Sequence, residues 1–192
     1  WVMAMLYEMK IDYLPISSDE DKLKGLIYTN KIIEQSKRYI NSTNIDYLEL
    51  VTIMAAYLHK LDLQKELNSD ITLEQEEMMF EDLYLLSKNN YFLLGQRDAN
   101  QKLFWIARKR KDFQRAIELA NENLALSKLI NSKRTETWAY IDLHSIYYHD
   151  LHRYSIGLEY QEKALGTVSN IDIWSGEDPV LWHCHYSRDL TS

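Results

Sequence analysis

Apolar side chains recur at steps of three and four residues along most of the chain. This spacing predicts helices, because it gathers the apolar groups on one helix face. No segment alternates apolar and polar residues long enough to predict a strand. The predicted helices begin near Asp19 and then cover residues 45–67, 72–88, 97–109, 113–130, 135–149 and 154–168.

Capping and turn residues mark the ends of these segments. Ser18 is a good N-cap for the first helix, and Thr72 with Gln75 has the spacing of a capping box. Asp178 followed by Pro179 predicts the start of an eighth helix. Helices joined by short polar turns predict a chain of about four antiparallel helical hairpins.

An internal repeat supports this arrangement. Aligning "DFQRAIELANENLALS" with "RYSIGLEYQEKALGTV" places Phe113 over Tyr154 and Ala116 over Gly157, at a constant offset in residue number (154 − 113 = 41). A small residue at this position lets two helix backbones approach closely, and the aromatic ring fills the gap above it. We therefore expect Gly157 to lie at a tight helix crossing.

This pattern resembles the tetratricopeptide-repeat family. The shared features are the aromatic residue after the turn, the small residue three positions later, and the closing Ala-Leu pair in "EKAL" at residues 162–165. The resemblance covers about residues 97–186 and implies an all-α fold, a right-handed solenoid of antiparallel helical hairpins. It divides the chain into N-terminal helices with degenerate repeats (1–92) and clearer repeats that end in an incomplete one (93–192).

The repeats depart from the family pattern in two ways. The offset of 41 exceeds the usual period of about 34, and His144 stands where a large aliphatic residue is usual. A related helical-hairpin solenoid is therefore the alternative fold.

The resemblance also implies a binding surface, because the first helix of each hairpin lines the concave face in this family. Trp105 beside Arg108 suits an apolar anchor and an acidic or carboxyl-bearing peptide. Gln101 and Trp105 replace the Lys and Asn that hold chaperone tails in some members, which argues against chaperone binding. The implied groove residues are Asp98, Gln101, Trp105, Arg108, Lys109, Asp142, Ile146, His149, Asp150 and His183.

The basic run Arg108–Lys111 has a second explanation. It ends a predicted helix, where cations interact favourably with the negative end of the helix dipole and with free carbonyl groups. The sequence leaves open whether the run binds an anionic partner or only terminates the helix.

Composition narrows the function classes. The chain has 192 residues, a net charge of −7, five Gly, two Pro and one Cys. The negative charge argues against general nucleic-acid binding, and the single Cys184 excludes an internal disulfide and favours a reducing, cytoplasmic location. The apolar opening "WVMAMLYEM" is short and contains Glu8, so we expect no signal peptide and no membrane span. Because the chain starts at Trp1 and not at Met, we expect it to be cut from a longer protein or to follow a tag.

Signatures of catalysis and metal binding are missing. The sequence has no glycine-rich phosphate loop, no nucleophile elbow and no paired Cys motif. His149 and His152 have no second ligand pair at convincing spacing, and His183 and His185 point to different sides of a helix. We expect no catalytic residues, no metal and no cofactor.

The predicted function is a non-catalytic protein- or peptide-binding scaffold or adaptor that uses the concave face of the array. The alternative is a peptide-sensing regulatory domain of a larger regulator or enzyme whose effector domain is absent from this chain. The eighth helix lacks a following partner helix, and Leu181 and Leu190 would lie near an open end. We therefore expect this apolar edge to be covered by downstream sequence, by a partner chain, or by self-association through the C-terminal helix.

Overall fold

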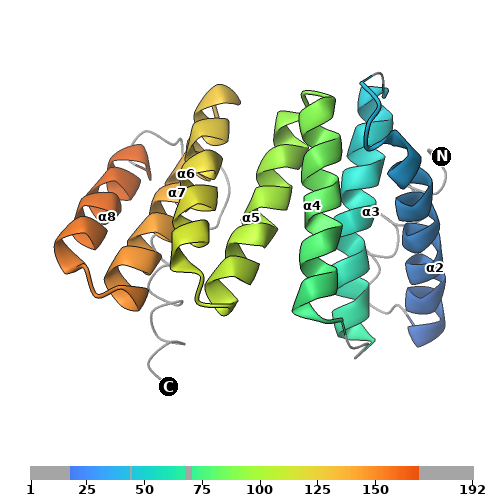
Figure 1. The fold of residues 1–192 in the computed structure, drawn as a ribbon, viewed down its shortest axis with the longest axis horizontal. Helices are drawn as coiled ribbons and strands as arrows, with labels where there is room; N and C mark the ends of the chain where they lie inside the picture. The colour runs from blue at the N-terminus through green and yellow to red at the C-terminus, as the bar shows by residue number, and fades with distance from the viewer. Residues whose placement is uncertain (1–17, 44, 68–70, 169–192) are drawn as a thin grey trace. The chain divides into compact units, whose positions relative to one another are not determined.

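The computed structural model describes residues 18–43, 45–67 and 71–168, and every regular element in these ranges is helical (Figure 1). The all-α prediction is confirmed, whereas the solenoid of hairpins stays a prediction. The seven α-helices, with a short 3-10 segment (η1) and a π-helical segment (η2), are α2 Asp19–Ser36, η1 Lys37–Tyr39, α3 Tyr47–Glu66, α4 Leu73–Asn89, α5 Leu93–Lys109, α6 Phe113–Leu129, α7 Lys133–Ser145, η2 Ile146–Asp150 and α8 Tyr154–Val168.

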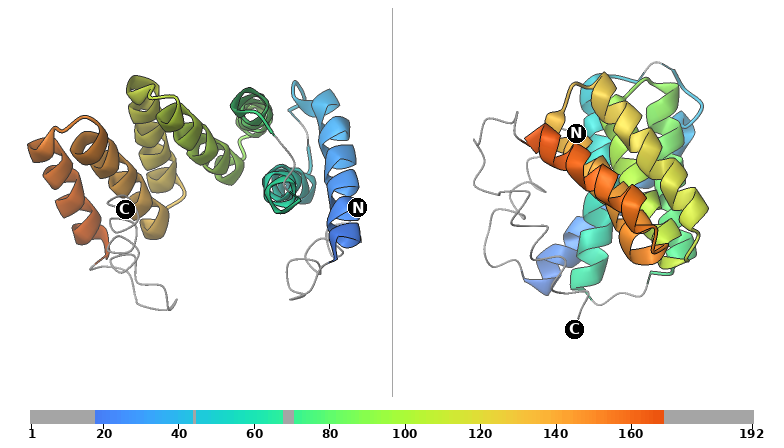
Figure 2. Two further views of the ribbon diagram at one scale, coloured as in Figure 1. Left: turned by 90° about the horizontal axis from the view of Figure 1, so that it is seen from below. Right: turned by 90° about the vertical axis from the view of Figure 1, so that its left-hand side faces the viewer.

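The chain divides into two compact units, residues 1–122 (unit 1) and 123–192 (unit 2). In unit 1, α2 packs against α3 and α4 packs against α5, and in unit 2 α7 packs against α8 (Figure 2). This boundary falls inside α6 and reflects packing. The division at residues 92 and 93 reflects repeat quality and stays a prediction.

Local capping explains where several helices begin. The Thr72 side chain accepts the Gln75 N–H at 3.3 Å, and the Gln75 side chain accepts the Thr72 N–H at 3.1 Å, which confirms the predicted capping box. The Ser18 side chain accepts the Asp21 N–H at 3.2 Å at the start of α2. Each bond satisfies a backbone N–H that has no partner within its helix.

Three consecutive turns share one backbone geometry. Tyr91, Lys111 and Asn131 adopt left-handed conformations with φ of 54°, 61° and 53°. In each turn the next residue's N–H donates to the carbonyl oxygen five positions earlier, at 2.8, 2.9 and 3.0 Å respectively. This is the Schellman ending of a helix, made here without glycine. The residue that closes each turn also opens the following helix.

The shared turn spaces the helix starts evenly in the sequence (93 − 73 = 20), and we call this spacing the regular step. Helices α4, α5, α6 and α7 begin at residues 73, 93, 113 and 133, and α8 begins at residue 154, one position later than the regular step requires. The extra residue lies in η2, where the Leu151 N–H donates to the Ile146 carbonyl, five positions earlier, at 2.9 Å. The offset of 41 in the sequence is therefore two regular steps plus one residue taken up by a π turn.

Burial follows the same step. Phe80, Asn100 and Ala120 occupy equivalent positions in α4, α5 and α6, and their exposed fractions are 0%, 1% and 0%. Tyr140, the next equivalent position, is 9% exposed. A position thus enters the core because of its place after the helix start, while the residue type there varies from aromatic to amide.

Two glycines lie where side chains crowd the backbone. A Cβ on Gly157 would lie 2.7 Å from the Tyr148 Cβ, which confirms the predicted tight crossing. The sequence pattern places Gly95 in a loop before a helix starting at Arg97, but Gly95 lies in the first turn of α5. A Cβ on Gly95 would meet the Ser87 Oγ and the Phe92 ring, so this glycine serves packing and not a turn.

Candidate functional site

Five side chains of α5 share its outward face, which we call the α5 face. They follow one another at steps of four and three residues, whereas Ala99, Leu103 and Ile106 on the opposite side are buried. Four were predicted groove residues, and all are at least partly exposed. The α5 face consists of Leu94, Asp98, Gln101, Trp105 and Arg108.

An aromatic ring and a cation meet near the end of this face. The guanidinium carbon of Arg108 lies 5.4 Å from the centroid of the Trp105 ring. The edge contact of Trp105 with Phe104, at 5.1 Å between centroids, fixes the indole against the core. Such a cation–π contact contributes about 0.5–1 kcal/mol at a partly exposed site. It presents a flat apolar surface and a positive charge side by side.

The charges on α5 are unbalanced. Arg97, Lys102, Arg108 and Lys109 are accompanied by a single anion in this helix, Asp98. Asp98 accepts from Arg97 Nε at 2.7 Å, so its charge is already compensated within the helix. Since the whole chain carries a net charge of −7, α5 is a local positive strip on an acidic protein.

The neighbouring basic residues have a structural role. Arg110 pairs with Glu77 and lies 3.4 Å from Glu74, both near the start of α4. These contacts connect the end of α5 to the beginning of α4 inside unit 1. The two explanations of the basic run therefore apply to different members: Arg110 stabilises the helix packing, whereas Arg108 and the exposed Lys109 belong to the outward surface.

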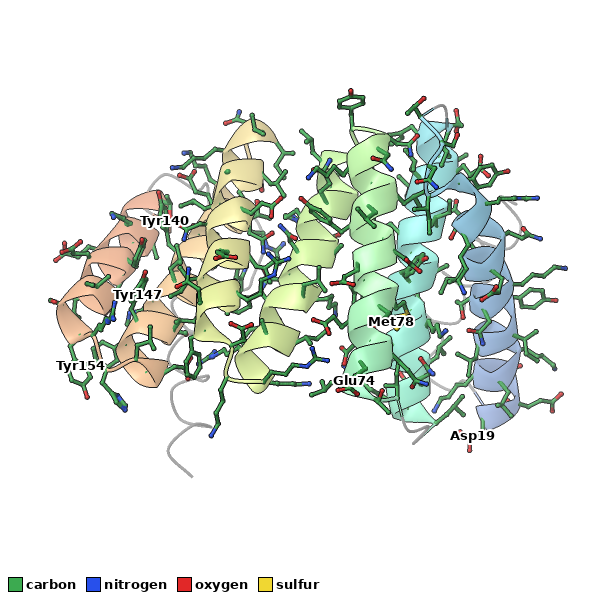
Figure 3. All side chains as sticks on the ribbon, in the orientation of Figure 1. Asp19, Glu74, Met78, Tyr140, Tyr147 and Tyr154 are labelled. Atoms are coloured by element: carbon green, nitrogen blue, oxygen red, sulfur yellow. The ribbon has the colours of Figure 1, made fainter. Side chains whose placement is uncertain are left out.

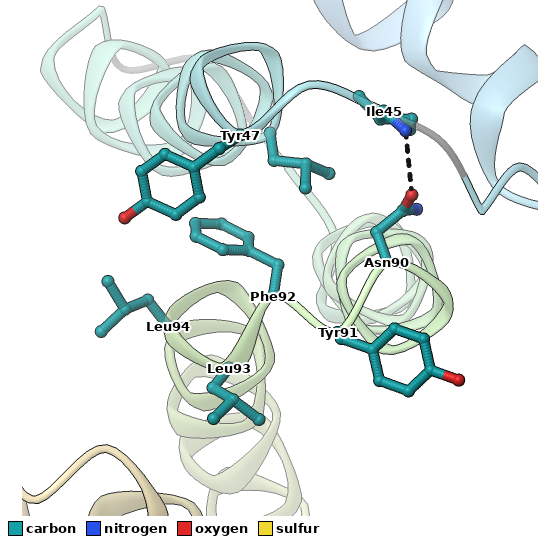
Figure 4. A pocket seen from close by; sticks show the side chains of 8 residues that line it. Ile45, Tyr47, Asn90, Tyr91, Phe92, Leu93 and Leu94 are labelled. Atoms are coloured by element: carbon teal, nitrogen blue, oxygen red, sulfur yellow. Dashed lines mark hydrogen bonds between the residues drawn. The ribbon is translucent and has the colours of Figure 1, made fainter.

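A pocket of about 330 Å³ opens at the other end of α5 (Figure 4). Leu50 and Phe92 are buried lining residues, each 4% exposed, and the Tyr47 ring meets Phe92 edge-on at 5.6 Å. Tyr91 is 86% exposed. The pocket is lined by Ile45, Tyr47, Leu50, Asn90, Tyr91, Phe92, Leu93 and Leu94.

Asn90 is the amide side chain among these lining residues, and its bonds hold the pocket together. Its carbonyl oxygen accepts the Ile45 N–H at 3.3 Å, and its amide nitrogen donates to the Ser42 and Leu86 carbonyls at 2.8 and 2.9 Å. Both amide hydrogens are used, so Asn90 fixes the entry of α3 against the end of α4. The surface that it leaves for a ligand is largely apolar.

Sequence reasoning missed this pocket for a definite reason. The pattern predicts a loop for "NNYFLL" and a helix start at Arg97, whereas α5 begins at Leu93. Leu94 was therefore not assigned to the face that carries Asp98 and Trp105. The available signal was the run of four large apolar residues directly after two Asn residues.

The predicted groove residues of unit 2 are corrected in part. Ile146 has no exposed surface and Asp142 is 4% exposed, so these two belong to the interior and offer no groove surface. The two lie four residues apart, and the Ile146 N–H donates to the Asp142 carbonyl, so regular helical geometry places both on one buried face. His149 and Asp150 are partly exposed, and His183 lies outside the described residues.

Aromatic rings surround the π turn. The buried His144 places Nδ1 2.9 Å from the Gly157 carbonyl oxygen and stacks on Tyr148 at 5.2 Å. Tyr147 stacks on Tyr160 of α8 with only 9° between the ring planes. Figure 3 shows Tyr140, Tyr147 and Tyr154 in succession along α7, η2 and the start of α8. His144 is therefore a core residue that also makes a hydrogen bond across the helix crossing.

Two further properties concern the described part of the chain. No group of three or more His, Cys, Asp or Glu side chains within residues 18–43, 45–67 and 71–168 is placed to hold a metal ion. None of the helices in these ranges is both long enough and apolar enough to cross a membrane.

The arrangement in unit 1 is thus an apolar pocket and a basic, aromatic strip on one helix. Such a surface can hold an apolar side chain and a carboxylate at the same time. No known protein-family model matches this chain, and no curated protein matches it.

Proposed function

We propose that this chain is a non-catalytic, tetratricopeptide-like module that binds an acidic peptide segment of a protein partner on the α5 face. The observation that carries the proposal is the Arg108 guanidinium over the Trp105 ring, 5.4 Å from its centroid. A partly exposed Trp–Arg pair is the kind of surface found at the centre of protein interfaces, because both residue types contribute large contact areas.

The charge pattern supports an acidic partner. Lys109 and Arg108 add positive charge beside Trp105, and Asp98 is compensated by Arg97. A carboxylate that approaches these cations can accept charge-assisted hydrogen bonds from them. The regular step between helix starts supports a repeat architecture, in which outward helix faces serve as contact surfaces.

The proposal is tested by reversing the charge at the end of α5. Arg108→Glu combined with Lys109→Glu should abolish the capture of acidic peptides from an array of short random peptides. The matched control is Lys24→Glu with Lys31→Glu on α2, which changes the net charge equally at exposed positions elsewhere in unit 1. Both variants should keep the wild-type circular dichroism spectrum.

Two results would contradict the proposal. The first is unchanged peptide capture by the Arg108→Glu, Lys109→Glu variant, which would return both residues to a purely structural role at the end of the helix. The second is an equal loss of capture in the α2 control, which would show that only net charge matters.

A further inference from the structure

The pocket and the α5 face are parts of one continuous surface within unit 1. Leu94 lines the pocket and is also the first residue of the α5 face. From Leu94 the face continues through Asp98 and Trp105 to Arg108 on the same side of a single unbroken helix. A ligand that lies along α5 therefore meets the pocket at one end and the cations at the other.

The length of this surface follows from helix geometry. Leu94 and Arg108 lie in the same helix, α5 (108 − 94 = 14). At a rise of about 1.5 Å per residue this interval corresponds to a distance of about 21 Å along the helix axis. An extended peptide covers this distance in about six residues, at about 3.3 Å per residue.

The chemistry of the two ends differs. The pocket is walled by Leu50, Phe92 and Leu94, and the Asn90 amide hydrogens already bond to the protein backbone. It suits a large apolar side chain, and its volume of about 330 Å³ admits one. The other end presents Arg108 and Lys109, which complement a carboxylate.

We infer that unit 1 recognises an extended acidic peptide with two anchors: a large apolar side chain in the Leu94 pocket, and a carboxylate about six residues away at Arg108. This inference rests on the proposed function and adds the position and spacing of the anchors. Charge complementarity favours such a peptide, because Arg108 and Lys109 present two cations where its carboxylate would lie.

The test uses fluorescence anisotropy with labelled synthetic peptides and the full 192-residue chain. Each peptide has a Leu anchor, a Gly-Ser spacer and a terminal pair of Glu residues. One spacer matches the distance of about 21 Å, one is about half as long and one about twice as long. A fourth peptide has the matching spacer and Ser in place of Leu. The matching Leu peptide should bind about tenfold more tightly than the other three.

Variants assign each anchor to its site. Leu94→Ala should reduce the affinity for the matching Leu peptide by about tenfold and leave the Ser peptide unchanged. Leu85→Ala is the matched control, because Leu85 is an exposed leucine of unit 1, at 46%, that does not line the pocket. Arg108→Glu with Lys109→Glu should weaken all four peptides.

The outcomes separate this inference from the proposed function. The Leu and Ser peptides could bind equally well, and both could lose binding in the charge-reversal variant. This result would overturn the two-anchor motif, while the proposed peptide binding would remain valid. Absence of any binding would overturn both. A concentration-dependent mass that falls in Leu94→Ala would show that a second copy fills the pocket. If the peptides bind only after residues 1–17 are removed, this segment of the chain itself competes for the pocket. Either result would overturn the inference.

Discussion

The crossing of α8 with η2 allows a quantitative test of the packing. At Gly157 a Cβ would lie 2.7 Å from the Tyr148 Cβ and 3.1 Å from both the Cα and the backbone nitrogen of Tyr148. Ordinary carbon contacts are about 3.5–4.0 Å. Two of the three neighbouring atoms belong to the backbone of the π turn, so a rotamer change cannot relieve the overlap. The helices must separate or the π turn must shift.

The expected cost is the difference between two terms. Gly157→Ala gains about 0.8–1.0 kcal/mol of helix propensity. Overpacking at a closed site costs about 1–3 kcal/mol. We therefore expect a net destabilisation of about 1 kcal/mol for Gly157→Ala, and about 2–4 kcal/mol for Gly157→Leu, which adds a larger group at the same crossing.

Gly166 supplies a matched control in the same helix. A Cβ on Gly166 meets nothing within 4 Å, so Gly166→Ala changes helix propensity without a clash. We expect it to be neutral or to stabilise the protein by up to about 1 kcal/mol, because it lies near the end of α8. The difference between the free energies of unfolding of the two alanine variants measures the effect of the close helix crossing alone.

The measurement is urea denaturation of both variants, followed by circular dichroism in the far ultraviolet. Gly157→Ala should have a lower midpoint than wild type, and Gly166→Ala an equal or higher midpoint. The reasoning is refuted if Gly157→Ala is at least as stable as Gly166→Ala. That result would mean that the helices at this crossing can separate without loss of contact energy.

Three further predictions concern other parts of the chain. Lys111→Gly should raise the melting temperature, because glycine adopts the left-handed conformation at this position (φ 61°) without the cost of about 1 kcal/mol that a Cβ brings. Burial raises the pKa of Tyr57 to about 12, so the folded state holds this proton more tightly than the unfolded chain, and stability should fall between about pH 10 and 12. Alkaline denaturation of Tyr57→Phe should show a smaller fall, and not none, because the pKa of Tyr84 is also raised to about 12. Leu158 and Leu165 are 48% and 50% exposed on one face of α8. Replacing both by Lys should lower the average mass in light scattering if this face mediates self-association.

Helix existence was predictable because local signals agreed with the apolar pattern. The Thr72 capping box and the polar turn before Phe113 each specify a helix start through bonds made within a few residues. The start of α5 was not predictable in the same way. Its N-cap is Phe92, whose side chain packs in the core and makes no capping bond, so the usual signal is missing.

The candidate site was also predictable only where local spacing decides the outcome. Asp98, Gln101, Trp105 and Arg108 were predicted from the family resemblance, and they share one face because their spacing in α5 is helical. Asp142 and Ile146 were misplaced because helical spacing shows which residues share a face, whereas the burial of that face depends on tertiary packing. The pocket joins residues of α3 to the turn before α5, so its detection requires tertiary contacts.

The weak sequence repeat and the regular helix spacing have a common physical origin. The turns at Tyr91 and Lys111 form the same backbone bonds, and the helices after them keep the regular step. Backbone bonds fix where each helix begins, so they also fix which of its positions become buried. The buried side chains can then differ in type from helix to helix, as Phe80 and Asn100 do. The residue type can vary even more at outward positions, because these side chains do not pack in the core. One helix can therefore carry Trp105 beside a cation without a change in the helix spacing. Recognition in this protein is therefore expected from the outward residues of individual helices and not from the repeated pattern itself.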